Sequence, residues 1–123
     1  KAKHLEKALM QFAEEGAAKV FKPNIGSGFI VGVVGALQFE VLASRIEMEY
    51  GLPVRFEPSQ FTSARWISGD KPAVEKVVAA NKQHIATDTD GDLVFLTRLQ
   101  WDIDRIERDN AGVKLTATKA MMV

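Results

Sequence analysis

Hydrophobic residues recur at two spacings along the first half of the chain, and each spacing predicts a kind of element. Four apolar residues at helical intervals open the sequence: Leu5, Ala8, Leu9 and Phe12. An apolar run at residues 29–34 is typical of a strand buried on both faces. Helical spacing returns over residues 39–50. With shorter strand-like stretches at residues 17–21 and 52–57, the first half predicts helix, strand, strand, helix, strand.

The second half repeats this alternation with one strand more. Strands are predicted at residues 62–68, 84–87, 93–96 and 113–118, with helices around Val77 and Ile103 between them. Strand, helix, strand, strand, helix, strand is the split βαβ, ferredoxin-like order. The first half shows the same order without its leading strand. We therefore predict an α+β fold of two ferredoxin-like units with antiparallel sheets, at residues 1–59 and 60–123, which together form one domain.

The absent leading strand has a physical consequence. In a complete ferredoxin-like unit the first strand lies centrally, so its absence leaves backbone groups without partners. We expect such an open edge to drive self-association by strand addition.

The last helix has a defined start and a defined inner face in the sequence. Thr97 and Gln100 have the spacing of a capping box, in which a hydroxyl and an amide satisfy the first free N–H groups. Leu99, Ile103 and Ile106 fall on one side of the helix and predict its buried stripe.

Composition narrows the classes of function. Sixteen basic residues balance sixteen acidic residues among 123, whereas a free-standing nucleic-acid binder usually carries a basic surplus. Any contact with RNA is therefore expected to be local. The absence of cysteine excludes disulfides, thiolate catalysis and cysteine zinc sites. No apolar run reaches the roughly 18 residues of a membrane span. A start at Lys1 instead of Met predicts a piece of a longer protein.

Three groups of residues raise the question of a cofactor or a metal. Gly32 and Gly35 have the wrong spacing for a dinucleotide loop, so we interpret them as a strand-to-helix turn in which a side chain would collide. His4 and His84 lack neighbouring ligands at metal spacing, and a solvated loop is the interpretation for His84. Asp residues at 88, 90 and 92 alternate as in a calcium loop, but the glycine and glutamate of that motif are missing, which favours a hairpin turn.

Arg65 and Trp66 are adjacent in one predicted strand and so point to opposite faces. Trp66 is expected in the core, because its small neighbours leave room, and Arg65 is expected outside together with Ile67. An exposed Arg can make forked contacts with phosphate or carboxylate, although a solvated charge remains the alternative. Trp101 lies off the inner stripe, where it either contacts a partner or covers the sheet edge.

Three stretches resemble the C-terminal domain of the bacterial peptide chain release factor 3 family: LEKALMQFAEEGAAKVFKP at residues 5–23, GVVGALQFEVLASRIEMEYGLPV at 32–54 and TSARWISGD at 62–70. The resemblance covers most of the chain and is most specific in its first seventy residues. The glycine-to-helix segment is also similar, more distantly, to the third domain of elongation factor G.

The resemblance implies a non-catalytic piece of a translational GTPase that promotes the departure of class I release factors in the bacterial cytoplasm. It implies upstream GTPase and β-barrel domains, where the full-length protein binds GTP and Mg. The chain itself lacks a GxxxxGK[ST] loop. The implied partners are the GTPase domain and the small ribosomal subunit, including protein S12 and nearby ribosomal RNA, with no membrane. Arg65, Trp101 and Arg45 are the residues we expect at that contact. No cofactor is expected in this chain.

Two other classes of function remain open at the level of sequence. Ferredoxin-like patterns also suit regulatory domains that sense small ligands near glycine-rich turns, and Gly26 to Gly28 could serve as such a turn. An enzyme is the third class, although no activated nucleophile, metal cage or cofactor loop is visible.

Overall fold

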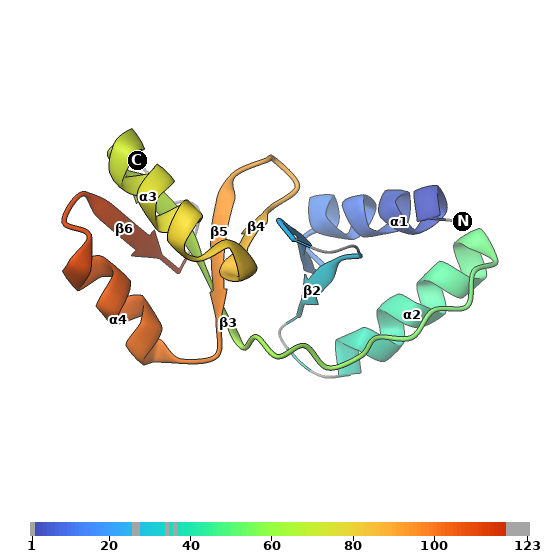
Figure 1. Cartoon of the computed structure of the whole chain (residues 1–123). Helices are drawn as coiled ribbons and strands as arrows, with labels where there is room; N and C mark the ends of the chain where they lie inside the picture. The colour runs from blue at the N-terminus through green and yellow to red at the C-terminus, as the bar shows by residue number, and fades with distance from the viewer. Residues whose placement is uncertain (1, 26–27, 34, 36, 118–123) are drawn as a thin grey trace. The chain divides into compact units, whose positions relative to one another are not determined.

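The computed structural model describes residues 2–25, 28–33, 35 and 37–117, and its elements are labelled in Figure 1. Their order is α1 (Ala2–Glu15), β1 (Lys19–Pro23), β2 (Ile30–Gly32), α2 (Leu37–Tyr50), β3 (Ser63–Gly69), α3 (Lys71–Ala80), the 3₁₀ turn η1 (Lys82–His84), β4 (Ile85–Thr87), β5 (Leu93–Thr97), α4 (Gln100–Asp109) and β6 (Val113–Thr116). The predicted α+β class is confirmed. Within the described ranges, no helix combines the length and the apolar character needed to cross a bilayer.

The chain divides into two compact units. The first unit comprises residues 1–20 and 30–58, and the second comprises residues 21–29 and 59–123. In the first unit, α1 and α2 pack against each other, and the buried faces carry Ala8, Leu9, Phe12, Leu42 and Ile46. The division of one domain into ferredoxin-like units at residues 1–59 and 60–123 stays a prediction.

The second unit has the ferredoxin-like arrangement that the order of its elements predicts. Its strands run β4-β5-β3-β6, so the first strand of the unit, β3, lies between β5 and β6. All three pairings are antiparallel, with Arg65 opposite Phe95 and Ile67 opposite Leu115. The end of β1 pairs antiparallel with β4 through Lys22 and Thr87.

Two helices cover one face of this sheet. The core there joins residues of α3 and α4 to the strands: Ile67, Val77, Ile85, Phe95, Ile103, Ile106, Val113 and Leu115. Ile103 and Ile106 are buried as the helical stripe predicts, but Leu99 is 54% exposed. Leu99 differs because α4 starts only at Gln100. Leu99 itself precedes the helix and is extended, with φ −120° and ψ 125°.

The central strand β3 is buried on both faces, which corrects part of the sequence interpretation. Trp66 is 5% exposed, as expected, and its ring meets the ring of Phe21 edge to face at 6.0 Å between centroids. Ile67 is only 4% exposed, so the expectation that it faces outward with Arg65 is wrong. The alternation of side chains was predicted correctly, but helices cover the face that was taken as solvated.

The start of α4 differs from a capping box. The Thr97 hydroxyl accepts a hydrogen bond from the Leu99 backbone N–H at 3.2 Å and donates to Asp102 Oδ2 at 2.8 Å. The Gln100 amide donates to Asp104 at 3.2 Å, one turn further along the helix, instead of reaching back. Thr97 therefore organises the strand-to-helix turn together with Asp102, and the predicted reciprocal pair is wrong.

Residues 51–60 contain no strand, which corrects the strand predicted at 52–57. The segment keeps the expected alternation, because Leu52, Val54 and Phe56 are half-buried between exposed neighbours. The Phe56 ring lies 5.2 Å from the ring of Phe39 in α2, measured between centroids. Alternating burial therefore identified an extended segment, but a strand also requires a neighbour that pairs with its backbone.

Two backbone segments approach closely where β3 ends. Gly69 has a φ of +131°, and the Asp70 N–H donates to the Gly112 carbonyl at 3.0 Å. A Cβ atom on Gly69 would overlap the Gly112 carbonyl oxygen, lie 2.9 Å from its carbon and 3.1 Å from Val113 Cα. A residue without a side chain is therefore required at position 69.

A carboxylate closes part of the sheet edge at β6. Glu107 of α4 accepts a hydrogen bond from the Leu115 backbone N–H at 2.9 Å. Unpaired N–H groups on edge strands attract other strands, and a charged side chain at such an edge opposes this. Glu107 thus satisfies one edge group from within the chain.

We expect Glu107→Ala to lower the free energy of unfolding by about 1–3 kcal/mol, because the variant leaves the Leu115 N–H without its acceptor. Chemical denaturation followed by circular dichroism measures the loss. Glu107→Gln is the matched control, since its amide oxygen can still accept, and we expect less than half of the effect. Equal losses in both variants would show that the hydrogen bond is not the cause.

Candidate functional site

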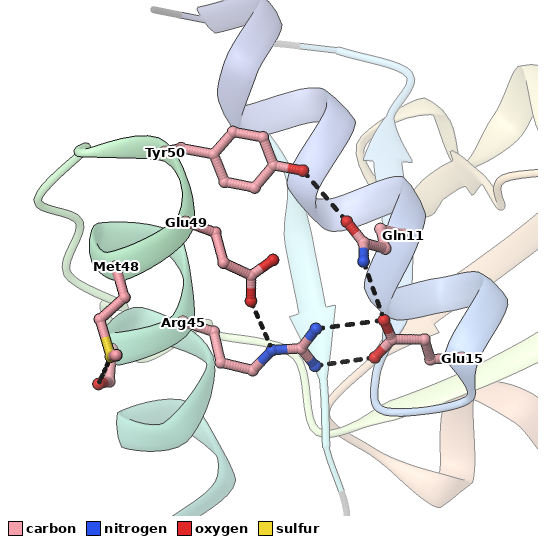
Figure 2. A network of polar contacts seen from close by, with 7 residues as sticks. Gln11, Glu15, Arg45, Met48, Glu49 and Tyr50 are labelled. Atoms are coloured by element: carbon pink, nitrogen blue, oxygen red, sulfur yellow. Dashed lines mark hydrogen bonds and ion pairs between the residues drawn. The ribbon is translucent and has the colours of Figure 1, made fainter.

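Arg45 of α2 lies at the centre of a polar network within the first unit (Figure 2). Its Nη1 and Nη2 atoms donate to the two carboxylate oxygens of Glu15 at 2.8 and 3.1 Å, and its Nε atom donates to Glu49 at 3.1 Å. The guanidinium carbon also lies 4.7 Å from the centroid of the Phe12 ring. A second link between the helices runs from the Tyr50 hydroxyl to Gln11 at 3.1 Å. Arg45 therefore fastens α1 to α2.

The Arg45 network shifts the ionisation of Glu15. Hydrogen bonding from Arg45 holds the pKa of the Glu15 carboxyl below its ordinary value of 4.5, and the same bonds raise the pKa of the guanidinium. Because the folded pKa of Glu15 is lowered, its contribution to stability is present above pH 4.5 and is lost as the pH falls through the lowered value.

We expect Arg45→Met to return the pKa of Glu15 toward 4.5, because the variant removes the donor with the largest effect. An NMR titration of the side-chain carboxyl carbon measures this directly. Arg55→Met serves as a control, since Arg55 pairs with Glu57 at 3.4 Å and should leave the titration of Glu15 unchanged. An unaltered Glu15 titration in Arg45→Met would contradict the assignment.

Arg65 and Trp101, the other two predicted contact residues, make separate local contacts in the second unit. Arg65 is half-buried, and its Nη1 atom donates to the Ala64 carbonyl oxygen at 2.9 Å. Trp101 is 60% exposed, and the guanidinium carbon of Arg105 lies 5.4 Å from its ring centroid. Its exposure agrees better with a contact residue than with a cover for the sheet edge. The role of Arg65, Trp101 and Arg45 at a ribosomal surface stays a prediction.

The glycines of the predicted strand-to-helix turn lie where expected, but the expected reason is incorrect for one of them. Gly32 ends β2, and the Gly35 carbonyl accepts a hydrogen bond from the Gln38 N–H at 3.0 Å, just before α2. A Cβ atom on Gly35 would meet none of the described residues within 4 Å, so no collision among them requires glycine there. Gly26 and Ser27 of the predicted ligand turn lie outside the described residues.

Asp88 organises the turn between β4 and β5. Its Oδ1 atom accepts from the Asp90 and Asp92 N–H groups and its Oδ2 atom accepts from Trp66 Nε1, all at 2.9 Å. The predicted hairpin turn is confirmed, because β4 and β5 are antiparallel neighbours on either side of it. One carboxylate oxygen from each of Asp88, Asp90 and Asp92 lies within 4.8 Å of the others, a spacing that could hold a cation.

A pocket of about 240 Å³ opens beside the β5–α4 junction in the second unit. Three separate segments line it: Gln60 and Phe61, then Gln83 and His84, then Thr97, Arg98, Leu99 and Asp102. Sequence reasoning missed this site, because no motif connects the three segments. The available signal was two Gln-aromatic pairs, GlnPhe at 60–61 and GlnHis at 83–84.

His84 lies in the wall of this pocket and not in a solvated loop, which corrects the sequence interpretation. Its Nδ1 atom is 2.8 Å from the Leu96 carbonyl oxygen. A carbonyl can only accept, so Nδ1 carries the proton of this bond. The ring stacks on Phe95 at 5.5 Å and 22°, and the Phe61 ring lies 5.7 Å away. The ring of the other histidine, His4, lies 6.4 Å from the Tyr50 ring, measured between centroids.

Residues 1–107 match the family described as "Class II release factor RF3, C-terminal domain". The chain belongs to this family. Two curated relatives are named "Peptide chain release factor 3", from Bordetella pertussis (strain Tohama I) and Bordetella parapertussis (strain 12822). Each is 47% identical over 98 residues, which cover 78% of this chain and 18% of the relative. The chain thus spans about a fifth of the length of these relatives.

Membership in the release factor 3 C-terminal family confirms the resemblance drawn from residues 5–70. The family match includes Arg45, Arg65, Trp101 and the whole lining of the pocket.

Proposed function

We propose that this chain is a non-catalytic C-terminal domain that couples a translation termination GTPase to the small ribosomal subunit and so promotes recycling of class I release factors. The observation that carries the proposal is the match of residues 1–107 to the release factor 3 C-terminal family. In the full-length bacterial, cytoplasmic protein, GTP and Mg would bind to an upstream GTPase domain, followed by a β-barrel domain.

Coupling of this kind requires contacts that differ between two states of the protein, not chemistry within this chain. The absence of a GxxxxGK[ST] sequence from this chain supports a nucleotide site in another part of the protein. The proposed partners are the upstream domains in cis and, on the ribosome, protein S12 with the ribosomal RNA near it.

Among the expected contact residues, Trp101 is the best placed to carry binding energy. Exposed Trp side chains are frequent hot spots of interfaces, and Leu99 is exposed beside it in sequence. The Arg65 guanidinium makes one hydrogen bond in the described region, to the Ala64 carbonyl oxygen. Its other N–H groups are therefore available to a partner. Arg45 would contribute least, because its three nitrogens already donate to Glu15 and Glu49.

The direct test is co-sedimentation of the purified 123-residue chain with small ribosomal subunits in moderate salt. We expect saturable binding, and a loss of about tenfold in affinity for Trp101→Ala. Met48→Ala is the matched control, because this apolar side chain is 83% exposed on α2 in the first unit. Absence of binding by the wild-type chain, or equal losses in both variants, would contradict the proposal.

Self-association remains a separate part of the proposal. We expect the chain to associate by strand addition if the first unit lacks a leading strand, and a version extended upstream to remain monomeric. Sedimentation velocity over a range of concentrations measures both. Two monomeric proteins at high concentration would refute the idea.

A further inference from the structure

We infer that the pocket beside the β5–α4 junction binds one unstacked nucleobase of single-stranded RNA. The inference rests on the proposed contact with the small ribosomal subunit, whose RNA would supply the base. The size of the pocket is the first argument. At about 240 Å³ it is smaller than the roughly 300–1,000 Å³ pockets that hold drug-sized ligands, and it suits a single planar ring system.

The aromatic wall of the pocket is the second argument. Phe61 and His84 both line it, with ring centroids 5.7 Å apart and planes at 56°. His84 is fixed from behind by stacking on the buried Phe95 and by its hydrogen bond to the Leu96 carbonyl. Every base has a π-face that can stack on such a ring, and this is how proteins commonly bind bases that have left a helix.

Polar groups that can read a base edge lie beside the rings. Gln60 and Gln83 each offer an amide donor and acceptor, and neither amide has a hydrogen-bond partner in the described part of the chain. Because Nδ1 of His84 donates to Leu96, Nε2 of the neutral ring is an acceptor. A base edge offers donors and acceptors that can pair with these groups, whereas an apolar peptide side chain offers none.

The charges around the pocket fit a ligand with a phosphate outside it. Arg98 lines the pocket, is exposed and has no ion-pair partner within the described ranges. Its guanidinium can therefore contact the phosphate that follows the base. The carboxylate of Asp102 is already engaged, since it accepts from Thr97 at 2.8 Å and lies 3.8 Å from Arg105. Arg98 is thus the available charge at the mouth of the pocket.

The test is a titration of the isotope-labelled 123-residue chain with four single-stranded RNAs of about six nucleotides, each made of one base. We expect shifts of the Gln60 and Gln83 amide signals and of the His84 ring signals. Gln83→Ala should weaken the preferred sequence about tenfold and reduce the preference for its base. Arg98→Ala should weaken all four sequences by a similar factor and flatten the salt dependence.

Two variants serve as matched controls. Arg108→Ala removes the same charge from the exposed side of α4, and Gln38→Ala removes an exposed amide from α2. Both should bind RNA as the wild type does. Equal losses for Arg98→Ala and Arg108→Ala, or no shift at the pocket with any RNA, would overturn the inference. The same shifts with free amino acids or an apolar peptide, but not with RNA, would assign the pocket to another ligand and refute it as well.

Failure of this inference can be distinguished from failure of the proposed function. If the chain co-sediments with small subunits while RNA leaves the pocket signals unchanged, the base pocket is refuted and the coupling proposal stands. If RNA shifts the pocket signals but the subunits do not bind, the coupling proposal is refuted and the pocket stands.

Discussion

Replacement of Gly69 by alanine is expected to destabilise the second unit by about 3 kcal/mol or more. The new Cβ atom would overlap the Gly112 carbonyl oxygen, a backbone atom that cannot move away without disturbing β6. The φ of +131° adds strain, because side chains rarely adopt this conformation. The hydrogen bond from the Asp70 N–H to Gly112 would be lost with the approach of the two segments. Chemical denaturation followed by circular dichroism measures the effect.

Gly91→Ala is a control that separates the effect of the steric collision from the effect of the positive φ. Gly91 lies in the hairpin of the same unit with a φ of +86°, but a Cβ atom there would have no neighbour within 4 Å in the part of the chain that the structure describes. We expect this variant to cost about 1 kcal/mol, from conformation alone. Similar losses at both positions would mean that the close approach of Gly69 and Gly112 does not matter for stability.

Phe95→Ala is the second change with a large expected effect, a loss of about 3–5 kcal/mol. Phe95 is 1% exposed in the central part of β5 and belongs to the core between the sheet and its two helices. Its removal would leave a cavity and would also take away the ring on which His84 stacks. The loss appears as a lower denaturation midpoint with an unchanged slope.

Phe61→Ala is the matched control for Phe95→Ala. Phe61 is half-buried, lies in the connector before β3 and lines the pocket instead of the core. Its removal should cost clearly less than that of Phe95, so the variant remains folded for the RNA titration. If Phe61→Ala destabilised the chain as much as Phe95→Ala, Phe61 would contribute to stability as a core residue does, and the distinction between pocket wall and core would be wrong.

The fold of the second unit was predictable from the sequence, because each of its elements carries its own signal. The strand at β5 is a continuous apolar run, and the stripe of Ile103 and Ile106 has helical spacing. Their order then allows few topologies, and the ferredoxin-like one is observed. The family resemblance added the family, which no periodicity contains.

The errors lie where a residue depends on a distant segment. Ile67 was placed outside because alternation divides a strand into two faces without showing whether both are covered. The segment at 52–57 alternates as a strand does. A strand also needs a neighbouring strand that pairs with its backbone, and the sequence of the segment does not show whether one is present. Leu99 has the right spacing for the inner stripe and lies one residue before the helix.

The candidate site was less predictable than the fold. Arg45 was predicted as a ribosome contact, which stays a prediction, whereas its observed contact with Glu15 joins residues thirty positions apart and no local pattern predicts it. The pocket joins three segments between Gln60 and Asp102 in the same way. For Trp101 the sequence showed only a place off the helical stripe and left open whether the side chain contacts a partner or covers the sheet edge; in the structure it is 60% exposed.

The hydrogen bond from Leu115 to Glu107 also determines how this end of the chain can open. It connects α4 to the strand that follows, closing a ring of backbone and side chain across eight residues. Fraying of the last helical turn and separation of β6 from the sheet would each break this bond. Transient opening at this end should expose helix and strand together, as one cooperative segment with a common rate of solvent access.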